Sequence, residues 1–225
     1  MLQSAQRVAV AGVCERLQGQ QAHASDPQTV ARLVSLEGCR ARLPLRKDER
    51  LVVTRVLMGK KPSARAKMLE KFIDVALNLR RRNNFNTLQS LISGLTSTPL
   101  SRLKQTQALL NPESAASFAN LEILMSSERT FARYRHALAI ADFPCIPYLG
   151  VVFRDLIYIE EGNKDLLPDG NVNFGKLLTM GDIILTVQGF QAKPHSVPKD
   201  PGVLSFILDS TVLSNEVRHN AMLGV

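Results

Sequence analysis

The sequence predicts an all-α fold, and three observations lead to that prediction. Apolar residues recur at the three- and four-residue spacing of a helix face along most of the chain. No segment alternates polar and apolar residues over a length that would predict a strand. With 225 residues, of which 45% are hydrophobic, the chain is long enough to bury the core of one helical domain.

The helix predicted over Ser63–Arg82 is the clearest element. It has an apolar face and a charged face, formed by Leu69, Phe72, Ile73, Ala76 and Leu77 and by Lys67, Glu70, Lys71 and Asp74. Pro62 is typical of a helix start, and the arginines at 80–82 lie where cations favour the C-terminal end of the helix dipole. We therefore expect the apolar face to belong to the core.

The remaining elements follow in chain order. Helices are predicted over Thr87–Leu95, Pro99–Leu110, Ser114–Met125 and Glu128–Ile140, then over a segment that ends at Glu161 and over Asn173–Phe190. Two segments rich in Pro, Gly, Ser and charged residues are predicted to be loops or linkers, Ala22–Asp48 and Gln191–Val203.

The last two predicted helices form an antiparallel hairpin, joined by a loop of about a dozen residues that contains Pro168 and Gly170. The first helix ends in the pair Glu160 and Glu161, followed by Gly162, which is predicted to be a left-handed C-terminal cap. Carboxylates are unfavourable at this end of the helix dipole. The pair therefore has two interpretations, a site for a partner or a solvated surface pair.

The composition excludes several classes of protein. The three cysteines are far apart, odd in number and form no C-x-x-C pair, so neither a disulfide framework nor a zinc site is indicated. The four histidines are scattered without other ligands at metal-site spacing, and we expect no metal and no cofactor. No run reaches the roughly 18 to 20 apolar residues of a membrane span, and the N-terminus has no signal-peptide pattern. We expect a cytoplasmic protein with no transmembrane segment.

The net charge of +8 is compatible with a nucleic acid, an anionic membrane surface or an acidic protein as partner. Tryptophan is absent, only three tyrosines are present, and no zinc-finger or aromatic RNA-binding motif occurs. The basic residues are mostly dispersed, and the one dense cluster, at 80–82, is explained by its place at a helix end. Nucleic-acid binding would rest on charge alone, so we expect no nucleic-acid partner.

Five short blocks occur in one order within residues 49–191. They are Asn83–Asn86, Ile92–Leu95, Ser101–Thr106, Pro147–Gly150 and Glu160–Asp165, the last followed by Asn173 and Phe174. Their order and spacing resemble the catalytic domain of Ras-type guanine-nucleotide exchange factors. The resemblance implies a partial RasGEF-like helical domain over residues 47–225, with a protruding helical hairpin, and a diverged or poorly matched flank over residues 1–46.

The resemblance also implies a function without covalent chemistry. In this family the hairpin is pushed into the nucleotide site of a Ras-family small GTPase, and GDP release is promoted because the nucleotide-free GTPase is bound better than the loaded form. Glu161 matches the carboxylate that takes the place of phosphate near the GTPase's P-loop. Ile157, four residues earlier on the same helix face, matches an aliphatic residue that disfavours the Mg²⁺ site. Asp155 and Tyr158 are predicted to be flanking residues.

A second surface is implied that grips the switch region of the GTPase. Tyr148, Phe131, Thr96 and Gln89 fall at or near its positions, although a core role explains Phe131 and Tyr148 as well. Gln89 stands where relatives tend to be aliphatic. Asn163 is expected to shape the end of the hairpin helix, with a direct contact to the GTPase as the lesser alternative.

Other departures from the family pattern leave alternatives open. Gln107 stands where relatives commonly carry tryptophan, and residues 1–46 do not supply the helices with which the family domain begins. The flank is thus a diverged remnant, or the chain is a truncated or mispredicted product. The alternative to an active exchange factor is a catalytically impaired or inactive interaction protein with an incomplete body. Which GTPase is the substrate does not follow from the sequence, and recruitment to membranes would be transient and through that GTPase.

Overall fold

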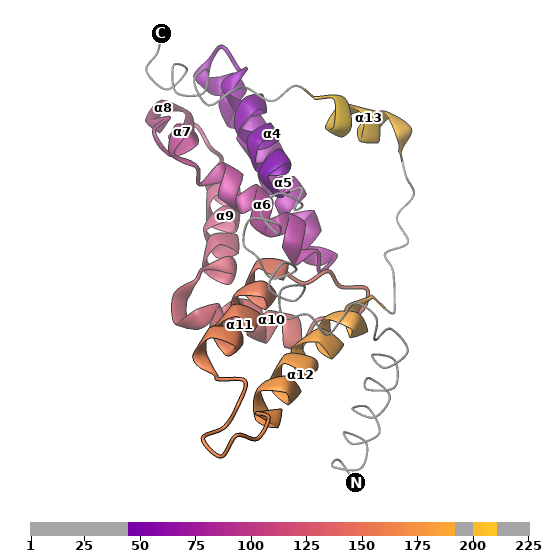
Figure 1. Cartoon of the computed structure of the whole chain (residues 1–225). Helices are drawn as coiled ribbons and strands as arrows, with labels where there is room; N and C mark the ends of the chain where they lie inside the picture. The colour runs from indigo at the N-terminus through magenta and orange to yellow at the C-terminus, as the bar shows by residue number, and fades with distance from the viewer. Residues whose placement is uncertain (1–44, 192–199, 211–225) are drawn as a thin grey trace. The chain divides into compact units, whose positions relative to one another are not determined.

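The computed structural model describes residues 45–191 and 200–210, and regular structure within these ranges is helical (Figure 1). The α-helices are α4 (Leu45–Leu57), α5 (Pro62–Arg81), α6 (Phe85–Leu95), α7 (Thr98–Ser101), α8 (Lys104–Gln107), α9 (Pro112–Met125), α10 (Ala132–Ala139), α11 (Leu149–Gly162), α12 (Phe174–Phe190) and α13 (Pro201–Asp209), with a 3-10 turn, η1, over Glu128–Thr130. In the described residues β-pairing is limited to isolated bridges, Asn84 with Ile146 and Leu166 with Val172. The all-α prediction is confirmed.

Helix α6 is the centre of the helical core, and α4, α5 and α9 pack against it. The large buried side chains of α6 are Phe85, Leu88, Leu91, Ile92 and Leu95. Gly94 allows α4 to approach closely, because a Cβ atom there would lie 3.1 Å from the carbonyl oxygen of Glu49 and from Cβ of Val52. The apolar face predicted for α5 is confirmed, with Leu69, Ile73 and Ala76 buried and Phe72 and Leu77 packed against the core.

Two segments predicted as continuous helices are broken. The segment over Pro99–Leu110 forms α7 and α8, because Leu103 leaves the helical region with ψ 63°. Leu100 and Thr106 are both buried, whereas a continuous helix would place them on different faces. The segment from residue 128 to 140 is interrupted at residues 129–131, which adopt left-handed conformations. Both predictions of one unbroken helix are wrong.

The predicted loops are shorter than expected at one end each. Residues 45–48 belong to α4 and residues 201–203 to α13. Arginine, lysine and glutamate are good helix formers, and proline favours the first position of a helix, so these helices begin inside segments that their composition marked as irregular. Residues 22–44 and 192–199 of the predicted loops lie outside the described residues.

Helices α11 and α12 form the expected hairpin (Figure 1). They pack against each other and are joined by residues 163–173. In this hairpin only Val151, Leu156 and Lys176 are fully buried. The ring of Phe190, at the end of α12, lies 5.6 Å from the ring of Phe143, which precedes α11. Among the helices that the structure describes, none combines the length and the apolar character needed to cross a membrane.

Candidate functional site

The base of the hairpin is fixed to the body by the polar turn before α6. The Phe85 backbone N–H donates to the Ile146 carbonyl at 2.9 Å, and the Ile146 N–H donates to the Asn83 carbonyl at 2.9 Å. The Asn86 side chain accepts from the Leu149 N–H, the first residue of α11, at 3.4 Å. The sequence blocks N-N-F-N and P-Y-L-G are therefore parts of one joint, which sets where α11 begins.

Tyr148 lies directly above this joint. Its backbone N–H donates to the hydroxyl of Tyr134 at 2.8 Å, and the Tyr134 ring packs edge-on against Phe85 with 5.4 Å between ring centroids. The Tyr148 ring lies over Gly150, where an added Cβ atom would overlap the ring carbons. Gly150 is thus required so that the Tyr148 ring can fold back over the first turn of α11.

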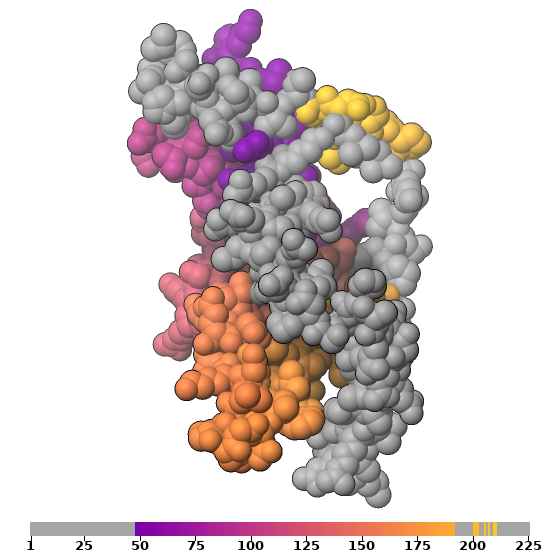
Figure 2. Space-filling model, viewed as in Figure 1, coloured from indigo at the N-terminus to yellow at the C-terminus, as the bar shows by residue number. Residues whose placement is uncertain are grey.

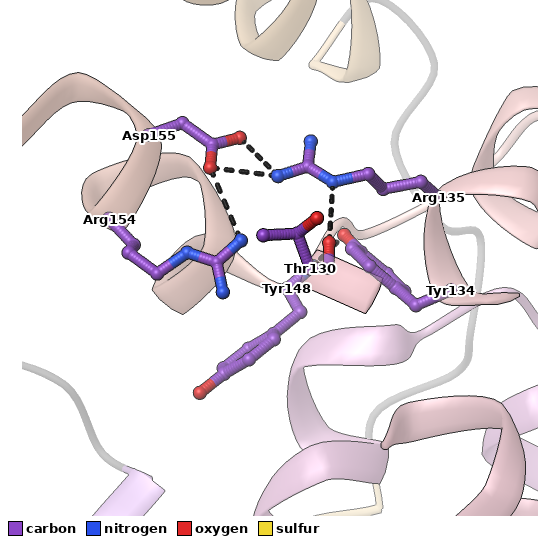
Figure 3. A network of polar contacts seen from close by, with 6 residues as sticks. All are labelled: Thr130, Tyr134, Arg135, Tyr148, Arg154 and Asp155. Atoms are coloured by element: carbon purple, nitrogen blue, oxygen red, sulfur yellow. Dashed lines mark hydrogen bonds and ion pairs between the residues drawn. The ribbon is translucent and has the colours of Figure 1, made fainter. Parts of the chain in front are cut away.

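Phe131 lies at the end of a left-handed turn that is held by Arg135. Arg129, Thr130 and Phe131 have φ of 46°, 57° and 63°, and a non-glycine residue in such a conformation costs of order 1 kcal/mol or more. The Arg135 Nε donates to the Thr130 carbonyl at 2.9 Å, and its Nη2 donates to both carboxylate oxygens of Asp155, at 2.8 and 2.5 Å (Figure 3). Arg135 therefore connects the turn that orients Phe131 to helix α11.

Arg154 completes this network from α11. Its Nη2 lies 3.4 Å from Asp155 Oδ1 (Figure 3). Its guanidinium also lies over the ring of Phe131 at 4.9 Å and over the ring of Tyr158 at 5.9 Å. The rings of Phe131 and Tyr148 are 6.2 Å apart and both are half-buried. Two of the residues predicted to bind the partner are thus brought together at the base of the hairpin.

The other two predicted contact residues on α6 are placed separately. Thr96 is exposed at the C-terminal end of α6, where its hydroxyl donates to the Ile92 carbonyl at 2.9 Å. Gln89 is half-buried, and its Nε2 lies 3.5 Å from Ser93 Oγ. Gln89 Oε1 is buried and makes no hydrogen bond within the described part of the chain. Gln89, Ser93 and Thr96 follow helical spacing and share one face of α6.

Ile157 and Glu161 lie one helical turn apart on α11, and the helix is unbroken between them. Ile157 is half-buried, whereas residues 160–172 are all exposed, and Figure 2 shows this orange segment at the surface. Glu160 forms an ion pair with Lys176 of α12 at 3.0 Å. Glu161 has no ion pair or hydrogen bond in the described residues. The two carboxylates therefore differ, since Glu160 is neutralised within the chain and Glu161 faces solvent.

The prediction of a left-handed cap at Gly162 is wrong. Gly162 is the last helical residue, and within the described residues Gly170, with φ 82°, is the glycine with a positive φ. Asn163 is extended, and its side-chain amide donates to the Ile159 carbonyl at 3.0 Å. This bond satisfies a carbonyl of the last turn, so no left-handed residue is needed there. The expected helix-end role of Asn163 is confirmed.

The loop between the hairpin helices is closed by its own hydrogen bonds. The Leu167 N–H donates to the Asn171 carbonyl at 2.7 Å, and the Gly170 N–H donates to the Leu167 carbonyl at 2.9 Å. The Asp169 carboxylate accepts from the Asn171 side chain and backbone at 2.9 and 3.1 Å, and these bonds lower the pKa of Asp169. The loop thus has a defined conformation at the end of the hairpin.

Three charged residues of the site were missed or undervalued from sequence. Asp155, predicted to be a flanking residue, pairs with Arg135, which lies 20 positions away and gives no local signal. Lys176 offered one signal, since it is the only basic residue of α12.

In the described residues no group of three His, Cys, Asp or Glu side chains is arranged to hold a metal ion.

Comparison with known proteins agrees with this architecture. The family model of the RasGEF domain matches residues 26–178. Ras-specific guanine nucleotide-releasing factor 1 of Rattus norvegicus is 32% identical over 176 residues, which is 78% of this chain. Ras guanine nucleotide exchange factors K and P of Dictyostelium discoideum are 34% and 37% identical, over 76% and 68% of this chain. The chain belongs to the RasGEF domain family.

The match covers a small part of each relative. The aligned region is 14% of the length of the rat protein and 11% and 10% of the lengths of the two Dictyostelium proteins. The family model also extends into the flank of residues 1–46, so the domain boundary at residues 46 and 47 stays a prediction.

Proposed function

We propose that this chain is a guanine-nucleotide exchange factor that promotes GDP release from a Ras-family small GTPase. In this proposal the α11–α12 hairpin enters the nucleotide site near the P-loop and the Mg²⁺ site. The observation that carries the proposal is that Ile157 and Glu161 lie on one face of α11, and that Glu161 is exposed and forms no ion pair in the described residues. The chain that carries this face belongs to the RasGEF domain family.

The chemistry of these two side chains fits the role. A P-loop presents backbone N–H groups and a lysine, which bind a carboxylate in place of phosphate. Glu161 is available for this exchange because Glu160, rather than Glu161, pairs with Lys176. Ile157 has no oxygen with which to replace the ligands that Mg²⁺ requires. Both contacts favour the nucleotide-free GTPase, so the exchange factor acts by differential binding and forms no covalent bond.

The grip on the GTPase would come from the base of the hairpin. Phe131 and Tyr148 form a half-buried aromatic pair that a partner side chain can complete. Thr96 and Gln89, on one face of α6, and Asn163, at the end of α11, are further proposed contacts. A membrane-attached GTPase would recruit this chain from the cytoplasm to the membrane transiently.

One observation favours the alternative of an impaired exchange factor that binds a GTPase without releasing its nucleotide. Apolar side chains of α12 are exposed, including Phe174, Leu177, Leu178 and Ile184. A hairpin with uncovered apolar surface lacks support that positioning requires. An active hairpin and an unsupported one predict opposite results in a nucleotide-release assay.

The experiment that tests the proposal measures release of a fluorescent guanine nucleotide from purified Ras, Rap and Ral proteins, with and without the chain. Faster release from at least one GTPase is expected, and the panel identifies the substrate. Binding to a nucleotide-free GTPase without faster release would favour the impaired alternative. Absence of both release and binding would contradict both forms of the proposal.

A further inference from the structure

Lys176 is a buried charge within α12, a helix whose other residues are mostly apolar. Its side chain is 3% exposed, and Nζ has three acceptors, Asp165 Oδ1 at 2.6 Å, Glu160 Oε2 at 3.0 Å and the Glu160 carbonyl at 3.3 Å. Burial opposes the charged form, but the bonds to Asp165 and Glu160 outweigh it, so the pKa of Lys176 is raised. The lysine is thus held as a cation that contacts both the end of α11 and the loop after it.

The contacts of Lys176 belong to a closed ring of bonds, which we call the hairpin neck, residues 160–165 and 173–176. The Asn173 N–H donates to the Asp165 carbonyl at 2.8 Å, and the Asn173 side-chain amide donates to the Lys164 carbonyl at 3.0 Å. The Asn173 side chain also accepts from the Lys176 N–H at 3.1 Å, which caps α12. Lys176 is the side chain that extends this ring to the last turn of α11.

A cation at this place also corrects an electrostatic problem of α11. Two carboxylates at the C-terminal end of a helix are unfavourable to the helix dipole, and the last carbonyls have no partner within the helix. Lys176 neutralises one carboxylate and binds the carbonyl of the same residue, Glu160. The last turn is therefore kept helical, and Glu161 is held in that turn.

We propose that Lys176 is a positioning residue for nucleotide exchange, because it locks the neck and so fixes the direction in which α11 presents Glu161. This inference rests on the proposed function. Without the lysine the last turn of α11 would fray, and its ordering would have to occur during insertion into the GTPase. A small error in the position of Glu161 should lower the rate of nucleotide release more than it lowers the rate at which the chain first binds the GTPase.

The first test uses hydrogen exchange on the free chain, with Lys176→Met compared with Lys164→Met. Both variants remove one lysine charge from the hairpin, and the Lys164 side chain makes no bond or ion pair in the described residues. In Lys176→Met we expect faster exchange of the amides of residues 160–165 and 173, with unchanged protection in α5 and α6. In Lys164→Met we expect the protection of the unmodified chain. Equal protection in the two variants would overturn the proposal.

The second test is kinetic and includes Glu161→Ala and the double variant Glu161→Ala/Lys176→Met. Lys176→Met should lower the maximal rate of nucleotide release roughly ten- to a hundredfold and change KM for the loaded GTPase much less. In the Glu161→Ala background the same substitution should have little further effect, since the lysine acts through Glu161. If the loss of release rate in the double variant equals the product of the losses in the two single variants, Lys176 acts independently of Glu161. That result would show a purely structural role and overturn the proposal.

Partner-side variants guard against a failure to fold. Glu160→Gln and Asp165→Asn each replace one carboxylate that pairs with Lys176 by a neutral amide and keep the other carboxylate, so smaller effects of the same kind are expected in exchange protection and release. If the unmodified chain releases no nucleotide from any GTPase, the proposed function fails and the positioning role fails with it. Normal release with an unchanged neck in Lys176→Met overturns the positioning role alone.

Discussion

The position of the Tyr148 ring depends on Gly150, two residues later in the sequence. The ring lies over Gly150, and the backbone of Tyr148 is fixed by the buried hydroxyl of Tyr134. Two features therefore set the orientation of the Tyr148 ring. Gly150 leaves room for the ring, and the hydrogen bond to the Tyr134 hydroxyl fixes the Tyr148 backbone. Such a ring is pre-organised for a partner, which reduces the entropy cost of binding.

Gly150→Ala should lower stability and slow nucleotide release, because the new methyl group displaces the Tyr148 ring. An alanine ordinarily stabilises a helix by about 1 kcal/mol relative to glycine, so a decrease in Tm would report the overlap. Gly162→Ala is the matched stability control in the same helix, because its Cβ would meet no atom within 4 Å. It should raise Tm. An increase in Tm for both variants would contradict the placement of the Tyr148 ring.

Gln89→Leu should stabilise the chain by about 1 kcal/mol, because it removes a buried amide oxygen that has no hydrogen bond in the described residues. Gln107→Leu is the comparison, since Gln107 Nε2 donates to the Leu100 carbonyl at 3.3 Å and the substitution removes that bond. Denaturant unfolding of both variants checks the prediction. A loss of stability in Gln89→Leu would show that its oxygen has a partner.

Alkaline pH should destabilise the base of the hairpin. Burial raises the pKa of Tyr134 to about 12 and that of Cys145 to about 11, from 10.0 and 9.0. A group with a raised folded pKa contributes stability that is complete below its unfolded pKa and is lost as pH rises through the folded pKa. Tm should therefore fall between about pH 9 and 12. Tyrosinate absorbance should show that at least one tyrosine, Tyr134, is still largely protonated at pH 11, and full ionisation of a folded chain at that pH would contradict this account.

At the scale of elements, α10 and α11 are coupled through the left-handed turn at residues 129–131. Arg135 bonds the turn and Asp155, while Arg154 lies over Phe131. The conformation of the turn is unfavourable alone and persists because these contacts hold it. The network therefore connects the aromatic pair of Phe131 and Tyr148 to α11, the helix that carries Glu161.

Removal of this connection should weaken the grip more than the fold. The Arg135 side chain is 43% exposed, so its pair with Asp155 should contribute about 0.5 to 1 kcal/mol to stability in a double-mutant cycle of Arg135→Met and Asp155→Asn. Nucleotide release should slow in both single variants, because Phe131 loses its orientation. A coupling energy of zero with unchanged release would show that the network has no role in the site.

The elements of the hairpin could be predicted because their signals are local. Helical spacing alone places Ile157 and Glu161 on one face, and Pro168 and Gly170 mark the loop between the helices. The contacts that hold the hairpin were not predictable, since Arg135 and Lys176 bond residues 11 to 20 positions away. The error at Gly162 has the same origin, because a side chain bond from Asn163 replaced the backbone cap.

At the scale of the whole molecule, the chain has a well-packed core and a hairpin with exposed apolar surface. Phe174 is 68% exposed, and Leu177, Leu178 and Ile184 are also exposed on α12. Exposed apolar surface of this kind is expected where a partner or a further segment packs. Removal of an apolar side chain should therefore lower stability in the core, and should mainly reduce the binding of a hydrophobic dye in the hairpin.

The purified chain should bind a hydrophobic fluorescent dye under native conditions, because of these α12 side chains. Leu177→Gln/Leu178→Gln should reduce dye binding with little change in Tm. Leu88→Ala, a fully buried residue of α6, should lower stability by about 2 to 5 kcal/mol. Dye binding that persists in the α12 variant, or a chain that melts without a cooperative transition, would indicate that the body itself is incompletely packed.

The central claim is tested most directly by nucleotide release with Ile157→Ala, Glu161→Ala and the double variant. Each single variant should remain folded and slow the release of a fluorescent guanine nucleotide from the responsive GTPase, and the double variant should slow it by less than the product of the two effects, since both side chains act on one inserted helix. Affinity for the nucleotide-free GTPase should fall more than affinity for the loaded form. A folded double variant that retains the full release rate would contradict the account and place the activity elsewhere in the chain.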